Sequence, residues 1–469
     1  MLKIELMAWT KKQLSIVGIV AVTSFMGTFL ISSVNIALPA IEQSFEMSAV
    51  ALSWVLTSFL LANAMFLLPA GRFGDLTGIR RMFKIGVVIF SLVSLSCGLV
   101  SDGFWLIILR FVQGMGAALT STTGPAILVS AFDAKNRGKV LGISVSGVYL
   151  GLASGPYLGG MLTEFAGWRS IFFVSSALGL ITVMLAFLFL GKDGKTDHGS
   201  KKVDLKGTAF YMMGLVALVA GSALIPKLIG LVLLLAGSLF LVVFWRYETK
   251  STYPVINTKL FTQNRLFSFS NLASLINYSA TFAIVFLLSL YLQKILKLSP
   301  QEAGTVLVAQ PVMMTLFSPL AGRLSDRIQP RYLTTLGMGM CSIGLLSFVF
   351  LTAQTPVWLI VIELVWLGLG FALFSSPNMN TIMSAVNKTQ YGIASGTAAT
   401  GRVLGQIVSM TIVALFLAGI LGNEAIDAAH IDDFMKVVKY GFITFSIISL
   451  AGIYFSYHRG EMRRTELQD

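Results

Sequence analysis

The feature of this sequence that most restricts its fold is a series of long apolar runs that contain almost no charged residue. A helix of about 20 apolar residues spans the hydrocarbon core of a bilayer, whereas soluble domains seldom contain such runs. The runs recur through all 469 residues, of which 55% are hydrophobic and only 12% are charged. Soluble domains carry about twice that charge. The sequence therefore predicts an all-α polytopic membrane protein.

Charged residues, Pro and Gly divide these runs into fourteen expected helices. Six precede a charged, glycine-rich segment at 191–206, two follow it, and six complete the chain. A count of twelve stays open if the pair between 207 and 246 does not cross the bilayer. The expected helices cover residues 14–38, 49–70, 82–101, 104–128, 138–162, 170–190, 207–226, 228–246, 267–292, 301–322, 332–352, 356–383, 394–420 and 434–457.

The basic residues indicate the orientation of these helices. Fourteen crossings put both termini on one side, and most of the 34 Lys and Arg residues fall in the loops of that side. By the positive-inside rule, this predicts a multi-pass protein of the cell membrane with both termini cytoplasmic. The net charge of +13 does not indicate nucleic acid binding, because the basic clusters are short and lie between apolar runs.

The two halves of the sequence resemble each other. Residues 71–75 (GRFGD) match residues 322–326 (GRLSD), and residues 105–110 (WLIILR) match residues 358–363 (WLIVIE) at nearly the same spacing. Two parallel repeats are a transporter architecture, in which the substrate cavity lies between the halves near the bilayer midplane. We expect an N-terminal six-helix bundle at 1–190, a linker at 191–206, an inserted helix pair at 207–246, a linker at 247–266 and a C-terminal six-helix bundle at 267–469.

The first of four local motifs is GRFGDLTGIRR at residues 71–81. Its glycines permit a tight turn between helices, and Asp75 can accept bonds from Arg72 or Arg81 or lie at a helix N-terminus. In a simpler interpretation the arginines only set the orientation, although that role needs no acid. The candidate gate residues are Gly71, Arg72, Asp75, Gly78, Arg80, Arg81 and, in the second half, Asp326.

Two more motifs lie within expected helices. Arg110, in LRFVQGMG, is costly inside a membrane unless it faces protein or water, and a structural bond to backbone carbonyls is one alternative. The segment GLASGPYLGG combines small residues that allow close helix contact with a proline that kinks the helix. Small-residue spacing alone is also common in ordinary packing. The candidate residues of this segment are Gly151, Gly155, Pro156, Gly159 and Gly160.

Together with VNIALP at residues 34–39, these motifs resemble those of the major facilitator superfamily, and within it the fourteen-helix drug:proton antiporters of the multidrug efflux type. The resemblance covers essentially the whole chain. It implies the major facilitator fold, a monomer, and export of amphipathic or cationic molecules by alternating access. It also implies that residues 71–81 latch the cytoplasmic gate, that Arg110 takes part in proton coupling, and that residues 151–160 indicate an antiporter. The sequence departs from the pattern at Leu30, where many relatives carry an aspartate.

Ionisable residues deep in the expected helices are candidates for proton coupling. They are Glu363, Arg110 and Arg402, with Glu164 near the outer end of the fifth helix. Because Glu363 occupies the repeat position of Arg110, we hypothesise that it lines the cavity and that substrate and proton compete for it. The alternative is a carboxyl group near the outer surface that bonds a neighbour.

Polar and aromatic residues within the cavity helices are candidate substrate contacts, because such groups suit amphipathic or cationic ligands. Each of them could instead anchor a helix at the interface or bond a neighbouring helix. The candidates are Asn35, Trp54, Asn63, Tyr149, Asn277, Tyr278, Gln310 and Asn378.

Other functions lack their motifs in this sequence. No GxxxxGK[ST] loop is present, so we expect no ATP and no other cofactor. Transport must then draw on an ion gradient or on the substrate's own gradient, and the resemblance implies a proton gradient as the energy source. The three histidines lie in expected loops or at a helix end, and Cys97 and Cys341 have no metal-ligand spacing. We therefore expect no metal site, and because no catalytic set is visible, no enzyme. The main alternative is an exporter or flippase of a specific metabolite or lipid on the same fold. Uptake by symport, or a membrane protein of another class, are further alternatives.

Overall fold

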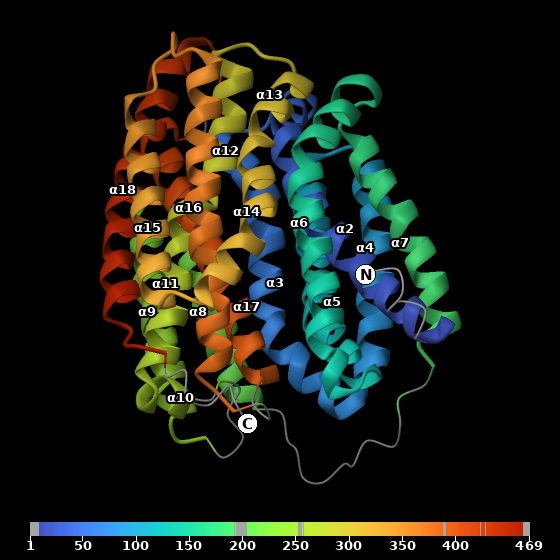
Figure 1. The fold of residues 1–469 in the computed structure, drawn as a ribbon. Helices are drawn as coiled ribbons and strands as arrows, with labels where there is room; N and C mark the ends of the chain where they lie inside the picture. Colours follow the sequence, from blue (N-terminus) through green and yellow to red (C-terminus); the bar gives the residue numbers. More distant parts are fainter. Residues whose placement is uncertain are drawn as a thin grey trace.

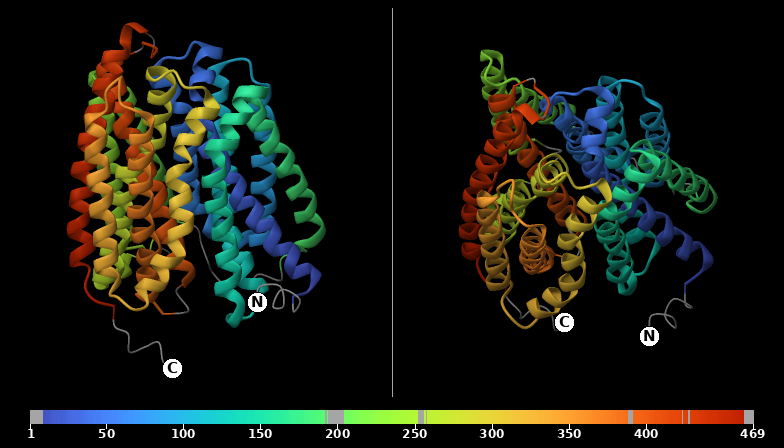
Figure 2. Two further views of the ribbon diagram at one scale, coloured as in Figure 1. Left: turned by 45° about the horizontal axis from the view of Figure 1, so that its top comes forward. Right: turned by 90° about the horizontal axis from the view of Figure 1, so that it is seen from above.

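The computed structural model of the protein describes residues 9–191, 193, 204–251, 256, 258–387, 391–422, 424–426 and 428–462. These residues fold into helices (Figure 1). Within them, fourteen helical spans are long and apolar enough to cross a membrane. The all-α class and the count of fourteen are thus confirmed. The start of the first span and the end of the last lie at one end of the molecule (Figure 2), which we call the terminal end. The opposite end is the distal end.

The first half of the chain forms six long helices. Several of them continue beyond the expected limits, because helical backbone extends past the apolar stretch. The first begins at a capping box in which Thr10 and Gln13 exchange hydrogen bonds. The six are α2 (Lys11–Phe45), α3 (Ala49–Thr77), α4 (Ile79–Leu99), α5 (Gly103–Ala131), α6 (Ala134–Ala166) and α7 (Arg169–Phe189).

The middle of the chain adds two spans, α8 (Leu205–Ala223) and α9 (Leu228–Glu248), and a short helix, α10 (Thr258–Gln263). The side chain of Asp204 caps α8 by accepting a bond from the N–H of Gly207 at 2.8 Å. Small residues let α8 and α9 approach closely, since a Cβ atom on Gly221 would lie 2.8 Å from the backbone nitrogen of Leu234.

The second half forms six spans, of which the first two are interrupted. The first consists of α11 (Arg265–Thr281), α12 (Ala283–Leu290) and the π-helical turn η1 (Tyr291–Ile295), and the second of α13 (Pro300–Leu307) and α14 (Ala309–Ser325). The others are α15 (Pro330–Ser347) with η2 (Phe348–Phe350), α16 (Val357–Ser384), α17 (Tyr391–Phe416) with η4 (Leu417–Leu421), and α18 (Ile431–His458), which follows η5 (Ala428–His430).

The two sets of six helices lie side by side as two bundles, with the inserted pair beside them (Figure 2). The bundles meet where α6 contacts α13 and where α3 contacts α17. Helix α8 contacts both α3 and α17, and the hydroxyl of Tyr211 donates to the carbonyl of Ala64 in α3 at 3.1 Å. The inserted pair therefore lies along the α3–α17 seam.

The outer helix of the inserted pair turns large apolar side chains outward. Leu228 is 76% exposed, Leu235 65% and Leu239 64%. In water such a surface would be unfavourable, whereas in a bilayer these side chains contact lipid and the helical backbone satisfies its own hydrogen bonds. The exposed apolar surface therefore agrees with a membrane protein.

Candidate substrate cavity

A cavity of about 2880 Å³ lies between the two bundles. Helices of both halves line it, together with α8 and α9. Arg72, Ser130 and Tyr391 are among the lining residues and lie near the terminal ends of α3, α5 and α17. Toward the distal end the lining reaches Asn35 and Pro156. The cavity thus extends from the terminal end deep into the molecule.

The proline of the VNIALP motif leaves a backbone acceptor free at the distal limit of this cavity. Pro39 has no N–H, so the carbonyl of Asn35, four residues earlier in α2, has no donor within the helix. The hydroxyl of Ser289 in α12 donates to this carbonyl at 2.7 Å, and the amide of Gln293 donates to the carbonyl of Ile36 at 3.0 Å. Side chains of the C-terminal bundle thus bind backbone groups of the N-terminal bundle.

Two carboxylates continue this contact toward the distal end. Glu42 is 3% exposed, lies 2.8 Å from Nζ of Lys294, and accepts a bond from the N–H of Ile426 at 3.1 Å. Glu164, at the end of α6, accepts a bond from the N–H of Gln301 in α13 at 3.0 Å. Both carboxylates belong to the N-terminal bundle, and all three partners belong to the C-terminal bundle.

Close backbone packing between α6 and α13 completes the distal seal. A Cβ atom on Gly304 would collide with the carbonyl oxygen of Pro156, and one on Gly160 would lie 2.5 Å from the carbonyl oxygen of Pro300. Only glycine allows so close an approach of two backbones. The distal end is therefore closed, and the cavity opens toward the terminal end.

The motif at residues 151–160 has a second packing surface. Gly151, Gly155 and Gly159 face α2, where a Cβ atom on Gly159 would lie 2.6 Å from Cβ of Ser33. The other two candidate residues of the motif, Pro156 and Gly160, lie at the contact with α13 just described. Through this motif α6 packs tightly on α2 and on the opposite bundle at once.

The segment expected as a loop after the second helix is helical. Helix α3 continues through residues 71–77, and the chain turns only at Gly78, whose φ is +105°. The expected loop is therefore wrong, because the helix continues beyond the apolar stretch instead of ending with it. Gly71 and Arg72 line the cavity from this helical extension.

The N-terminus of α4 is capped by an acid from another part of the chain. The backbone N–H groups of Arg80 and Arg81 donate to the two carboxylate oxygens of Asp193 at 3.0 and 3.1 Å. Asp193 was expected in a solvated linker, but its charge instead stabilises the positive end of the α4 dipole. The side chain of Asp75 lies outside the described part of the structure, and Asp326 is exposed after α14.

Arg110 is fully buried in the N-terminal bundle and does not line the cavity. Its Nε donates to the carbonyl of Val55 at 3.0 Å, its Nη1 donates to Oε1 of Gln113 at 2.6 Å, and its guanidinium lies 4.4 Å from the ring centroid of Phe59. Gln113 in turn donates to the hydroxyl of Ser94 at 2.5 Å. These contacts join α3, α4 and α5, and the bond to the Val55 carbonyl is of the kind expected if Arg110 has a structural role. Its role in proton coupling stays a prediction.

Glu363 also lies away from the cavity. It is half-buried in the distal part of the C-terminal bundle beside Ser347, and its Oε2 is buried without a hydrogen-bond partner. The expectation that Glu363 lines the cavity is therefore wrong for this conformation, because its face of α16 packs against α15. Its part in proton coupling stays a prediction.

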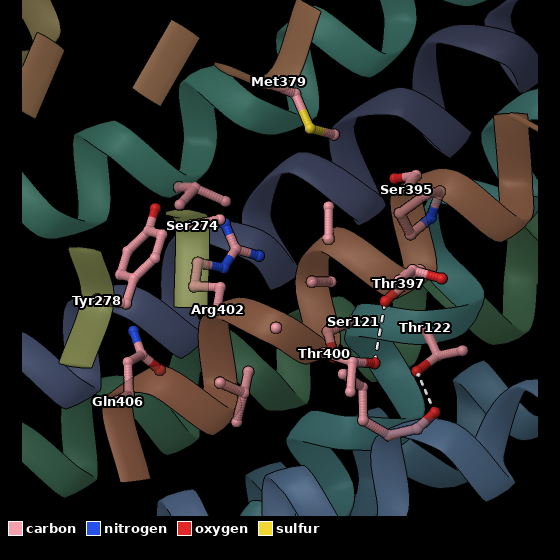
Figure 3. Close-up of a pocket in the computed structure, with 18 of the residues that line it drawn as sticks. Ser121, Thr122, Ser274, Tyr278, Met379, Ser395, Thr397, Thr400, Arg402 and Gln406 are labelled. Carbon is pink, nitrogen blue, oxygen red and sulfur yellow. Dashed lines mark hydrogen bonds between the residues drawn. The ribbon is translucent and has the colours of Figure 1, made fainter. Parts of the chain in front are cut away.

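Arg402 does line the cavity. At a rise of about 1.5 Å per residue, it lies about 17 Å along α17 from the terminal end of that helix, within the candidate membrane span Ile393–Leu421. Figure 3 shows its side chain beside Tyr278, with Gln406 one turn along α17. The helices are close here, since a Cβ atom on Gly405 would lie 2.5 Å from the carbonyl oxygen of Leu275. Among the described residues, no carboxylate pairs with Arg402.

Most of the residues expected as substrate contacts line the cavity. Trp54 and Asn277 are the two corrections: Trp54 packs against the apolar core, and Asn277 is fully buried beside Cys341. Helical periodicity alone does not show which apolar or polar face of a buried helix meets the cavity. The residues that do line it are Asn35, Asn63, Tyr149, Tyr278, Gln310 and Asn378.

One of these residues is held by a buried arginine that the sequence did not single out. Arg459, just after α18, is 1% exposed and donates to Oδ1 of Asn378 at 2.7 Å. It also donates to the carbonyl of Ser456 at 2.8 Å and to the hydroxyl of Thr334. Burial lowers the pKa of its guanidinium to about 9. Arg459, which does not itself line the cavity, therefore holds the side chain of Asn378 in the cavity wall.

The chemical groups on the cavity wall can bind a small molecule. In the described part of the chain, no three His, Cys, Asp or Glu side chains lie together in a way that could hold a metal ion. Cys97 and Cys341 are both buried, in α4 and α15. The wall provides the guanidinium groups of Arg72 and Arg402, the charged groups of Lys259 and Glu248, several amides and hydroxyls, and apolar surface.

Comparison with known proteins agrees with this architecture. The sequence profile described as Major Facilitator Superfamily matches residues 18–410 and 270–466. The chain is 32% identical over 411 residues to the riboflavin transporter RibZ of Clostridioides difficile (strain 630), covering 87% of this chain and 89% of that protein. It is 30% identical over 392 residues to the multidrug resistance protein Stp of Mycobacterium tuberculosis (strain ATCC 25618 / H37Rv), covering 82% and 72%.

The fold is also similar to solved structures. An inward-facing, unoccupied bacterial homolog to the human lysosomal transporter Spinster superposes with a TM-score of 0.68 at 14% identity, over 96% of this chain and 98% of that one. The similarity at this identity concerns the fold alone.

Proposed function

The chain belongs to the major facilitator superfamily, and from this we propose that it is a proton-coupled antiporter that exports amphipathic small molecules by alternating access. One observation carries the proposal: the cavity between the two bundles opens at the terminal end and is sealed at the distal end. A secondary transporter needs a binding site that is reached from one side of the bilayer at a time.

We assign the terminal end to the cytoplasm of the cell, because the loops there carry most of the basic residues. The cavity then faces the side from which an exporter takes its substrate. Export is supported by the motif at residues 151–160, which contributes to the distal seal and resembles the antiporter motif of the family. The name of the relative Stp, a multidrug resistance protein, is also in keeping with efflux.

The proposed energy source is the proton gradient, which the resemblance to the drug:proton antiporters implies, and the sequence has no phosphate-binding loop that would indicate ATP instead. We retain Glu363, Arg110, Glu164 and Arg402 as proposed coupling residues. Glu164 contacts the opposite bundle at the distal seal, and Arg402 lies in the cavity wall. A change of charge at Glu164 would therefore affect the contact at which the two bundles move apart, and a change of charge at Arg402 would affect the place where the substrate binds.

A narrower alternative is an exporter or flippase of one specific metabolite or lipid on the same fold. It is favoured by the 32% identity to a protein named riboflavin transporter, which covers nearly the whole of both chains. The two alternatives differ in how many unrelated molecules the protein moves.

The test uses the full-length protein in proteoliposomes with an imposed pH difference. Two xanthene dyes serve as probes, anionic fluorescein and cationic rhodamine 123, and dye content is measured after lysis in a common buffer. We expect inside-acidic vesicles to accumulate at least one dye, and a protonophore to abolish the accumulation. Equal filling with and without the gradient would contradict proton coupling, and movement of neither dye would favour the narrower alternative.

A further inference from the structure

The charges on the cavity wall are mostly basic. Among the described lining residues, Arg72, Glu248, Lys259 and Arg402 are the Arg, Lys, Asp and Glu side chains. The first three lie at or near the terminal ends of α3, α9 and α10. Arg402 is the one that lies deep in the cavity, so the inner part of this wall carries a positive charge.

The groups around Arg402 are neutral. The Tyr278 hydroxyl lies beside its guanidinium, and Ser375 lies next to that hydroxyl. Tyr149, from the opposite bundle, reaches the same place, with its hydroxyl 3.3 Å from the hydroxyl of Ser375. The rings of Tyr278 and Phe371 meet edge to face with centroids 5.3 Å apart. Arg402 therefore faces hydroxyls and aromatic surface contributed by both bundles.

An arginine in this position requires a partner. A cation inside a membrane protein is costly when no opposite charge compensates it, and such residues mark substrate or ion pathways. The guanidinium presents several donors in a planar fork that matches the two oxygens of a carboxylate or a phosphate. A cationic molecule, in contrast, would be repelled from this part of the cavity.

We propose that Arg402 is the recognition site for an anionic group, and that the exported molecules are amphipathic anions with an aromatic body. The oxyanion contacts the Arg402 guanidinium, the hydroxyls of Tyr278 and Tyr149 complete its bonds, and the aromatic body lies against Tyr278 and Phe371. This inference rests on the proposed export function and names its substrate class. It departs from the expectation of cationic substrates.

The test compares the two xanthene dyes for binding to the purified full-length protein in detergent, by fluorescence anisotropy. Fluorescein carries the carboxylate, whereas rhodamine 123 carries a methyl ester in its place and one positive charge. We expect the wild-type protein to bind fluorescein at least roughly tenfold more tightly, because a hydrogen-bonded charge pair contributes that much or more. Arg402→Gln should remove this preference.

Two further variants separate charge, geometry and folding. Arg402→Lys keeps the charge but loses the planar fork, so fluorescein binding should fall between that of the wild type and Arg402→Gln. Lys297→Gln removes a positive charge from an exposed position outside the cavity and should leave binding within about twofold. If Arg402→Gln cannot be purified, the wild-type dye preference and the Arg402→Lys variant still decide the question.

The results distinguish this inference from the proposed function. Preference for rhodamine 123, absence of fluorescein binding, or unchanged fluorescein binding by Arg402→Gln would overturn the anion site. Gradient-driven movement of rhodamine 123 would leave the export function intact in the same case. If fluorescein binds through Arg402 but no gradient drives it, the site stands and proton-coupled export fails.

Discussion

Glu42 and Lys294 join the two bundles at the distal end, with Nζ of Lys294 2.8 Å from Oε2 of Glu42. Glu42 is 3% exposed and also accepts a bond from the N–H of Ile426, so one carboxylate holds two segments of the C-terminal bundle. For the cavity to open distally, both contacts must break. The pair therefore stabilises the sealed state relative to any state open at this end.

Lys294→Gln should shift the protein toward the distally open state. Removing the cation leaves Glu42 buried without its charged partner, at a cost of about 1.5–3 kcal/mol, which corresponds to a roughly tenfold or larger shift in population. The measurement is the rate at which an impermeant maleimide, added on the distal side, labels a cysteine placed at Ala303. Ala303 is fully buried in α13 next to the seal. We expect labelling to accelerate about tenfold.

The matched control is Lys297→Gln, three residues further along the chain. Lys297 is exposed, and within the described residues it forms no ion pair. Its substitution removes the same charge without touching the seal and should leave the labelling rate unchanged. Equal acceleration by both variants would mean that net charge, and not the Glu42 pair, controls distal opening.

Pro39→Ala tests whether the missing backbone donor of α2 is what makes the Ser289 contact favourable. Alanine restores an N–H that can bond the Asn35 carbonyl within the helix, in competition with the hydroxyl of Ser289. Pro39→Ala and Ser289→Ala should each weaken the seal by about 0.5–1.5 kcal/mol, measured by the same labelling assay. Because both substitutions act on the hydrogen bond to the Asn35 carbonyl, the double variant should weaken the seal no more than the more severe of the two single variants does. Additive effects would show that the two residues act independently.

Gly304→Ala should prevent the distal seal from forming. Its Cβ atom would collide with the carbonyl oxygen of Pro156, and backbone on both sides leaves no room for adjustment. We expect dye accumulation in proteoliposomes to fall at least roughly tenfold, since a steric overlap of this size disrupts close helix packing. Gly142→Ala in α6 is the control, because a Cβ atom there meets nothing within 4 Å. A variant with full accumulation would mean that the α6–α13 contact can loosen without loss of transport.

The fold could be predicted from the sequence because each span carries its own signal. Apolar length, the basic loops and the repeat together indicate fourteen helices, and the described part of the chain contains fourteen such spans. The ends were less accurate: the segment at 71–77 is helical, and the ninth and tenth spans are interrupted near Phe282 and Val308. Polarity marks where a chain leaves lipid, but a helix can continue into water beyond that point.

The site was less predictable, because contacts between the bundles depend on tertiary structure. Pro39 could have indicated a free carbonyl in α2, yet nothing local shows that Ser289 supplies its donor. Asp193 belongs to a charged, glycine-rich segment that predicts a linker, and nothing in that segment shows that its carboxylate caps α4. The repeat pairs Arg110 with Glu363, but neither residue lines the cavity. A repeat places residues at equal depth without showing which helix face meets the cavity.

If Glu363 takes part in proton coupling, its substitution should affect coupling without affecting substrate binding. Glu363 does not line the cavity, so a substrate cannot contact it directly in this conformation. Glu363→Gln keeps the shape of the side chain but cannot release a proton. If Glu363 carries the coupled proton, the variant should bind dye like the wild type and exchange it across proteoliposomes without a gradient, while accumulation driven by a pH difference is lost.

The control for this variant is Glu46→Gln, an exposed carboxylate after α2 at the same end of the molecule. It should accumulate dye as the wild type does, because an exposed group makes little contribution to a buried proton pathway. Undiminished accumulation by Glu363→Gln would remove Glu363 from the mechanism. The proton would then have to bind at another carboxylate, and Glu248 in the cavity wall and Glu164 at the distal seal are the positions from which protonation could affect substrate binding or opening.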